Sequence, residues 1–125
     1  MIKTIIIADD SATARMIIKR CFEIAGCAEA TFLDAGDGEQ ALELAKTNQP
    51  DLLITDLNMP KMDGRSLLIH LKASPMLHGL PVIVITSANN EAKENELRGL
   101  GALAVLSKPI TPPEVAKLLE TIGTM

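Results

Sequence analysis

The amino-acid sequence predicts an α/β fold, a three-layer doubly wound sheet of five parallel strands. Short apolar, β-branched runs alternate along the chain with stretches whose apolar residues recur at helical spacing. Runs such as residues 82–85 are apolar throughout, which is typical of parallel strands covered on both faces. Right-handed crossovers between these strands place the helices in two layers, one on each face of the sheet.

The expected strands are rich in Ile, Leu and Val, and polar or turn residues follow each of them. They cover residues 5–8, 30–33, 52–56, 82–85 and 103–106, and the run at 30–33 is the weakest.

The expected helices carry capping residues at their starts. The first begins at Ser11 or Asp10, either of which can cap it, and Gly26 is its expected end. Its predicted apolar face consists of Ala14, Ile17, Ile18, Cys21 and Ala25. The remaining helices are expected to begin near residues 37, 63, 90 and 111, with capping patterns at 37 and 111.

Length and composition restrict the class of protein. The chain has 125 residues, and we expect one domain over residues 1–125 with no output domain. A net charge of −4 and 2% aromatic residues, with no Trp or Tyr, argue against direct nucleic-acid binding. No apolar run approaches a membrane span and no signal peptide is evident, so a cytoplasmic location is expected, with Cys21 and Cys27 as free thiols.

Polar residues follow four of the expected strands. They are Asp9 and Asp10, Asp56, Thr86 and Lys108. The carboxyl ends of parallel strands meet at the edge of the sheet where ligands bind, so these side chains are expected to lie together. Three carboxylates in one pocket repel one another, and a hard divalent cation such as Mg²⁺ removes that repulsion.

Asp56 is the natural nucleophile of this group, because a carboxylate can form an aspartyl phosphate. Lys108 would neutralise a phosphate oxygen as a point charge, and Thr86 would donate a hydroxyl. Taken singly, each residue has an ordinary alternative: a strand-end Asp in a turn, a solvated Lys, or a strand-end Thr. Pro109 directly after Lys108 restricts that loop and makes a cis peptide bond one alternative.

In this order and spacing, the residues match a known family. The chain resembles the receiver domain of two-component response regulators, in its single-domain chemotaxis-regulator form, over essentially its whole length. The resemblance implies a flavodoxin-like fold with strand order 2-1-3-4-5. The motifs that carry it are Asp9-Asp10, Asp56 within Asp-Leu-Asn-Met-Pro, Met62-Asp63-Gly64, Thr86, Gly101-Ala102 and Lys108-Pro109.

The resemblance implies a phosphoprotein that signals by changing its binding to partners. Asp56 would accept a phosphoryl group from a sensor histidine kinase or a histidine phosphotransfer protein. Asp10 and Asp56 would ligate Mg²⁺, with Mn²⁺ as an alternative. Asn58 would add its backbone carbonyl, and Asp9 would hold the metal through a water.

The resemblance also implies the phosphoryl-binding and switch residues. Lys108 and Thr86 would contact the phosphoryl group, and Ser87 is the small residue that leaves room for it. The Lys108-Pro109 bond would be cis. Val105 departs from the family, because many members carry Tyr or Phe there and turn the ring inward on activation. Ala88, like Asn58, lies where the family tunes hydrolysis of the aspartyl phosphate.

The partners that the resemblance implies are proteins. A downstream protein target would be reached in trans, with no direct nucleic acid and no membrane. The expected contact face is the fourth helix (residues 90–100), the fifth strand (103–106) and the last helix, through which homodimers also form in this family.

Two other functions are weighed from the residues. A Mg²⁺-dependent phosphohydrolase with Asp56 as nucleophile usually has a second carboxylate as general acid soon after it, and position 58 is Asn. A carrier of flavin mononucleotide would need aromatic residues that stack on the flavin, and this chain has no Trp or Tyr. We therefore expect a phosphoacceptor regulatory domain rather than an enzyme, beyond self-phosphorylation from small phosphodonors and autodephosphorylation.

Overall fold

A computed structural model describes residues 2–87 and 89–122 of the chain. Strands and helices alternate, as the sequence predicts. The strands are β1 (Thr4–Ala8), β2 (Thr31–Ala35), β3 (Leu52–Asp56), β4 (Val82–Thr86) and β5 (Ala104–Ser107). The helices are α1 (Ala12–Phe22), α2 (Gly38–Asn48), α3 (Gly64–Ala73), α4 (Glu91–Gly99) and α5 (Pro112–Ile122), with a π-helical turn, η1 (Glu23–Cys27), after α1.

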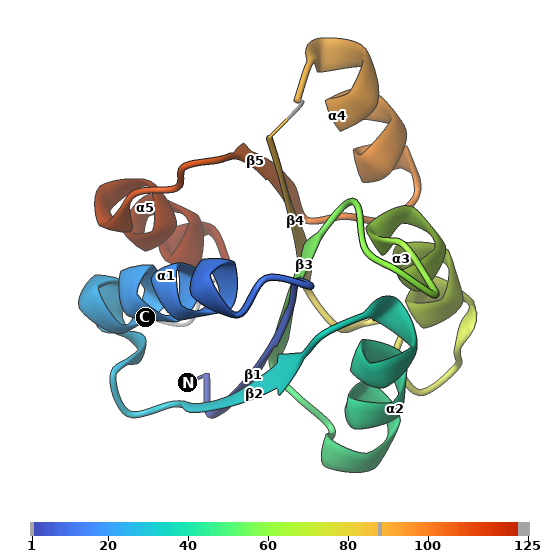
Figure 1. Cartoon of the computed structure of the whole chain (residues 1–125), viewed down its shortest axis with the longest axis horizontal. Helices are drawn as coiled ribbons and strands as arrows, with labels where there is room; N and C mark the ends of the chain where they lie inside the picture. The colour runs from blue at the N-terminus through green and yellow to red at the C-terminus, as the bar shows by residue number, and fades with distance from the viewer. Residues whose placement is uncertain (1, 88, 123–125) are drawn as a thin grey trace.

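The five strands form one parallel sheet in the order β2-β1-β3-β4-β5. Helices α1 and α5 cover one face, and α2, α3 and α4 cover the other (Figure 1). This is the predicted three-layer doubly wound architecture, and the strand order reverses beside β1. In the described part of the chain, no helix combines the length and apolar character that crossing a membrane requires.

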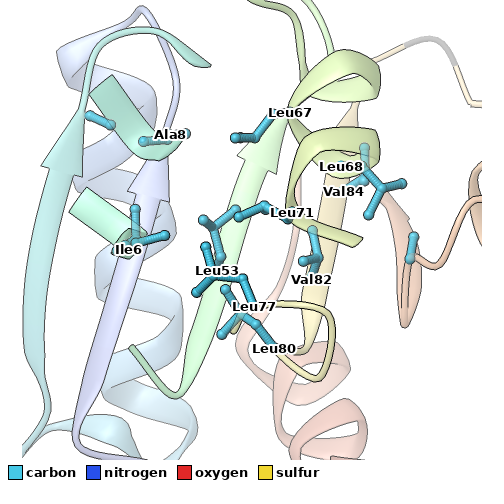
Figure 2. Close-up of a cluster of buried hydrophobic side chains, with 14 of the residues drawn as sticks. Ile6, Ala8, Leu53, Leu67, Leu68, Leu71, Leu77, Leu80, Val82 and Val84 are labelled. Carbon is cyan, nitrogen blue, oxygen red and sulfur yellow. The ribbon is translucent and has the colours of Figure 1, made fainter. Parts of the chain in front are cut away.

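Two hydrophobic cores lie on opposite faces of the sheet, because side chains alternate along each strand. Ile6, Leu53 and Val82 pack with α2 and α3 in the first core, where Leu67, Leu68 and Leu71 of α3 are also fully buried (Figure 2). The second core, against α1 and α5, contains Ile5, Ile7, Ile54, Ile83, Ile85 and Phe22. Strands β1, β3 and β4 are thus buried on both faces, as their continuous apolar runs predict.

The five predicted helix starts are confirmed at capping residues, and Asp63 and Asn90 accept hydrogen bonds from the N–H groups three residues ahead. Ser11 accepts a hydrogen bond from the Ala14 N–H, and Asp37 accepts one from the Gln40 N–H. Thr111 accepts a longer one from the Glu114 N–H, at 3.4 Å. Each satisfies one of the backbone donors that a helix leaves free in its first turn.

Two predictions for the first helix need correction. The α-helix ends at Phe22, and Gly26 lies inside the π-helical turn that follows, with a φ of 127° that favours glycine. Ile17, predicted to be core, is 53% exposed. It lies at a cavity between α1 and the loop after β5, where no described side chain covers it fully.

Two glycines bring the loop between β3 and α3 close to the sheet and to α2. A Cβ on Gly64 would lie 2.2 Å from the backbone oxygen of Asp56, and one on Gly38 would lie 2.2 Å from that of Met62. The Gly64 N–H donates to the Leu57 oxygen at 2.8 Å, and the Gly38 N–H donates to the Met62 oxygen at 3.1 Å. These contacts hold the backbone that follows Asp56.

Candidate phosphoacceptor and metal site

Three carboxylates meet at the carboxyl edge of the sheet. Asp9 follows β1 and is 1% exposed, Asp10 is exposed beside it, and Asp56 is the last residue of β3. Oxygen atoms of all three lie within 4.8 Å of one another. The sheet places them there because β1 and β3 are adjacent and parallel, with Ala8 opposite Thr55.

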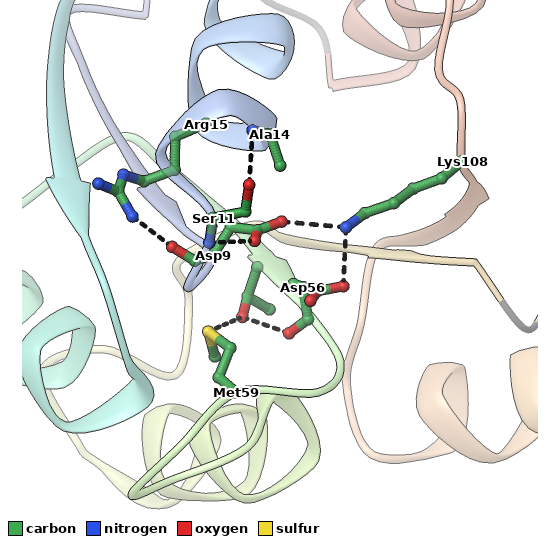
Figure 3. A network of polar contacts seen from close by, with 8 residues as sticks. Asp9, Ser11, Ala14, Arg15, Asp56, Met59 and Lys108 are labelled. Carbon is green, nitrogen blue, oxygen red and sulfur yellow. Dashed lines mark hydrogen bonds and ion pairs between the residues drawn. The ribbon is translucent and has the colours of Figure 1, made fainter.

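Lys108 joins two of these carboxylates (Figure 3). Its Nζ lies 3.0 Å from Asp9 Oδ2 and 3.2 Å from Asp56 Oδ1. The other oxygen of Asp9 accepts a hydrogen bond from the Ser11 N–H at 2.9 Å. One ammonium group therefore pairs with two of the three carboxylates, and the pocket keeps an excess of negative charge.

Burial and the neighbouring charges shift the pKa values of Asp56 and Lys108. Burial raises the pKa of Asp56 and the Asp9 charge raises it further, while Lys108 and the Leu57 N–H oppose the rise. Burial by itself lowers the pKa of Lys108, but the hydrogen bonds and charges of Asp9 and Asp56 outweigh it, so that pKa is raised. Lys108 thus remains a cation beside Asp56 at neutral pH.

The donor set fits a hard divalent cation. Carboxylate oxygens from three residues converge, and hard oxygen ligands are those that Mg²⁺ selects. Asn58 lies two residues past Asp56 in the loop that Gly64 and Gly38 hold, and its side chain is exposed. The sequence predicts that its backbone carbonyl adds a further oxygen ligand.

The remaining predicted residues lie on β4, on β5 or directly after them. Thr86 is the last residue of β4 and is 1% exposed, and Ser87 follows it at the surface. Val105 is buried in β5, at 5% exposed, opposite Val84. The Lys108-Pro109 peptide bond is cis. Ala88 lies outside the described residues.

Comparison with known proteins identifies the family. A model of the response regulator receiver domain matches residues 5–120. The chain belongs to the response regulator receiver family. It is 31% identical to the probable chemotaxis protein CheY of Rhizobium etli, over 94% of this chain and 90% of that relative. It is 30% identical to the polar-differentiation response regulator DivK of Brucella ovis, over 98% and 94% of the two chains.

Solved receiver structures share the whole fold. The chemotaxis protein CheY4 of Vibrio cholerae superposes with a TM-score of 0.84 at 26% identity, over 98% of this chain and 99% of that one. Some relatives are longer: the chain spans 49% of the alkaline phosphatase synthesis regulatory protein PhoP of Bacillus subtilis. The predicted family and flavodoxin-like fold are confirmed, and the function is that of a receiver domain in two-component signalling.

Sequence reasoning missed Arg15, which lies beside the receiver site on α1. Its Nη1 donates to the backbone oxygen of Asp9 at 2.5 Å, and its Nε lies 3.4 Å from Asp34 Oδ2 on β2. The only indication of this role in the sequence is that an arginine lies next to the apolar face of the predicted helix. That position does not reveal a contact with a backbone oxygen.

The raised pKa of Asp56 predicts a pH-dependent gain in stability for Asp56→Asn. The folded state binds the Asp56 proton more readily than the unfolded chain, because the pKa of this carboxyl is raised. The contribution of Asp56 to wild-type stability therefore falls as pH rises above the usual carboxyl value of 3.8. Asp56→Asn removes this loss and should be the more stable protein at neutral pH. The difference should disappear at a pH where the carboxyl is protonated in both states. Urea unfolding with a chelator present measures it, and an equal or lower stability of Asp56→Asn at neutral pH would contradict the expectation.

Proposed function

We propose that Asp56 is the phosphoacceptor of this receiver domain and that it takes its phosphoryl group from a protein phosphohistidine. The donor is a sensor histidine kinase or a histidine phosphotransfer protein. The observation that carries the proposal is the position of Asp56, where its carboxylate lies 3.2 Å from Lys108 Nζ and shares a pocket with Asp9 and Asp10.

The site supports each part of the transfer. One oxygen of Asp56 attacks phosphorus, the P–N bond to the donor histidine breaks, and the P–O bond to Asp56 forms. Lys108 neutralises a phosphoryl oxygen, and the Thr86 hydroxyl donates to another, with Ser87 leaving space beside it. Asp10, Asp56 and the Asn58 carbonyl would hold Mg²⁺, or Mn²⁺ in its place, with Asp9 reaching it through a water. The metal would supply positive charge to the phosphoryl oxygens.

An apolar surface beside the pocket supports docking of the donor protein. Met16 and Ile17 on α1 are 68% and 53% exposed. Ile17 lines a cavity of about 320 Å³, together with Ile85, Lys108 and Pro109. This surface is continuous with Lys108, so a donor bound there would hold its phosphohistidine close to Asp56.

We propose that the output is binding to a protein target in trans, through the face formed by α4, β5 and α5. We also propose that a homodimer can form through this same face. Strand β4 ends at Thr86, opposite Ser107 of β5, and the Lys108 N–H donates to the Thr86 oxygen at 3.0 Å. Because Val105 has no ring to move, the signal would pass through this backbone contact. We also propose that the chain acts as a regulatory domain rather than as an enzyme, and in the cytoplasm, where its two buried free thiols are stable.

Incubation with acetyl phosphate tests the phosphoacceptor. We expect wild-type protein to gain one phosphoryl group by mass spectrometry when Mg²⁺ is present and none when it is chelated. Asp56→Asn should gain none. Asp63→Asn is the matched control, because Asp63 is an exposed helix cap that Asn replaces well, and it should behave as wild type.

Two outcomes would overturn the proposal. One is a phosphoryl adduct of equal yield in Asp56→Asn. The other is multiple turnover of a phosphate ester by the wild type, which would instead support the phosphohydrolase alternative.

A further inference from the structure

We infer that Arg15 is a positioning residue that aims the Asp10 carboxylate into the metal pocket by holding the peptide unit that precedes it. This inference rests on the proposed metal site. Asp10 follows the Asp9 carbonyl directly, so the orientation of that carbonyl sets the direction in which the Asp10 side chain leaves the backbone.

Asp10 has little else to orient it. Its side chain is exposed, and within the described part of the chain no residue donates a hydrogen bond to its carboxylate. By contrast, every polar group of Asp9 has a hydrogen-bond or ion-pair partner. Its N–H donates to the Ala35 oxygen at 3.0 Å, and its carboxylate accepts from the Ser11 N–H and from Lys108. The Asp9–Asp10 turn is therefore fixed on the Asp9 side, and Asp10 depends on the backbone alone.

Arg15 holds the last free group of Asp9, the carbonyl oxygen. Its Nη1 donates the hydrogen bond to that oxygen that is drawn in Figure 3. The two atoms are 2.5 Å apart, and the arginine side chain is only 18% exposed. A guanidinium is a rigid planar fork, so anchoring one nitrogen orients the others. Asp34 provides that anchor through an ion pair without a hydrogen bond, its Oδ2 lying 3.4 Å from Arg15 Nε. Asp34 lies on β2 opposite Ile7 of β1, and thus the arginine braces the end of β1 against the neighbouring strand.

Charge and positioning predict opposite results when Arg15 is removed. If the arginine acted only as a positive charge near three carboxylates, its removal would tighten Mg²⁺ binding. If it positions Asp10, its removal weakens binding. Loss of a group that orients a metal ligand typically costs 10-fold or more in affinity, so we expect Arg15→Gln to bind Mg²⁺ about 10-fold more weakly.

The test is the Mg²⁺ dissociation constant, followed by amide NMR shifts because the chain has no Trp. Arg20→Gln is the matched control. It makes the same charge change on the same helix, but Arg20 is 74% exposed and pairs with Glu23 at 3.7 Å. Its Mg²⁺ affinity should stay close to that of wild type.

A double-mutant cycle tests the anchor. Asp34→Asn should weaken Mg²⁺ binding in the wild type but cause no further loss in Arg15→Gln, because Asp34 acts through the arginine. Additive losses would overturn this link. Arg15→Lys keeps the charge without the fork and should recover only part of the affinity. If Arg15→Gln does not fold, Arg15→Lys carries the test, and wild-type affinity in that variant overturns the inference.

The outcomes separate this inference from the proposed function. A wild-type protein that binds no Mg²⁺ would overturn the metal site itself. A wild type that binds Mg²⁺, with equal or tighter binding in folded Arg15→Gln, would leave the metal site intact and overturn the role of Arg15. Lower stability of Arg15→Gln with unchanged Mg²⁺ affinity would show a structural brace and would likewise overturn it.

Discussion

Gly64→Ala should destabilise this receiver domain by about 3 kcal/mol, the upper end of the usual cost of overpacking. The added Cβ would lie 2.2 Å from the backbone oxygen of Asp56 and 3.0 Å from Leu57 Cα. Both atoms are backbone, so no side chain can rotate away to relieve the overlap. The movement must come from α3 or from the end of β3, and Leu67, Leu68 and Leu71 fix α3 in the core.

The measurement is the free energy of unfolding in urea, together with phosphorylation by acetyl phosphate. Because the strain acts on the Asp56 backbone itself, we also expect slower phosphorylation of the fraction that stays folded. Gly99→Ala is the control, since nothing lies within 4 Å of its added Cβ and it ends helix α4. It should be neutral or slightly stabilising, as replacing Gly by Ala in a helix usually is. A similar stability for both variants would contradict the close packing described for Gly64.

Much of the fold could be predicted from the sequence because strands such as β4 are apolar along almost their whole length. The β4 run has no polar residue before Thr86, and only a strand buried on both faces explains such a run at that length. The edge strand β2 is harder. It was expected at residues 30–33, whereas the ladder with β1 extends it to Ala35, past the exposed Asp34. Strand β5 is likewise shifted by one residue, because its pairing with β4 sets its ends.

The sequence predicts the site residues that lie at strand ends. It does not predict the residues whose contacts depend on the direction and length of a side chain. Asp9, Asp10, Asp56 and Lys108 converge because parallel strands end at one edge, which sequence order alone reveals. Arg15 and Asp34 meet only through the packing of α1 against β2. The exposure of Ile17 likewise depends on tertiary packing, because the neighbouring elements leave a cavity beside it. Such contacts need coordinates, because many side-chain directions are compatible with one helical pattern.

Lys108→Met should slow phosphorylation of Asp56 by about 100-fold, since removing one preorganised charged donor from a transition state typically costs that much or more. Met has a similar length and no charge, so it keeps the packing of the stem. Lys117→Met is the control, because Lys117 is exposed on α5 and loses the same charge. The rate of adduct formation with acetyl phosphate, at saturating Mg²⁺, measures the effect. A wild-type rate in Lys108→Met would contradict the role proposed for this lysine.

The same variant should bind Mg²⁺ more tightly than wild type. Lys108 Nζ lies within 3.2 Å of oxygens of both Asp9 and Asp56, so it competes with the metal for two of the three carboxylates. Arg15→Gln removes one positive charge from the same rim, yet it is expected to weaken Mg²⁺ binding. Net charge alone cannot produce opposite signs from two equal charge changes. Opposite shifts in the two dissociation constants would therefore distinguish a lysine that competes with the metal from an arginine that prepares its site.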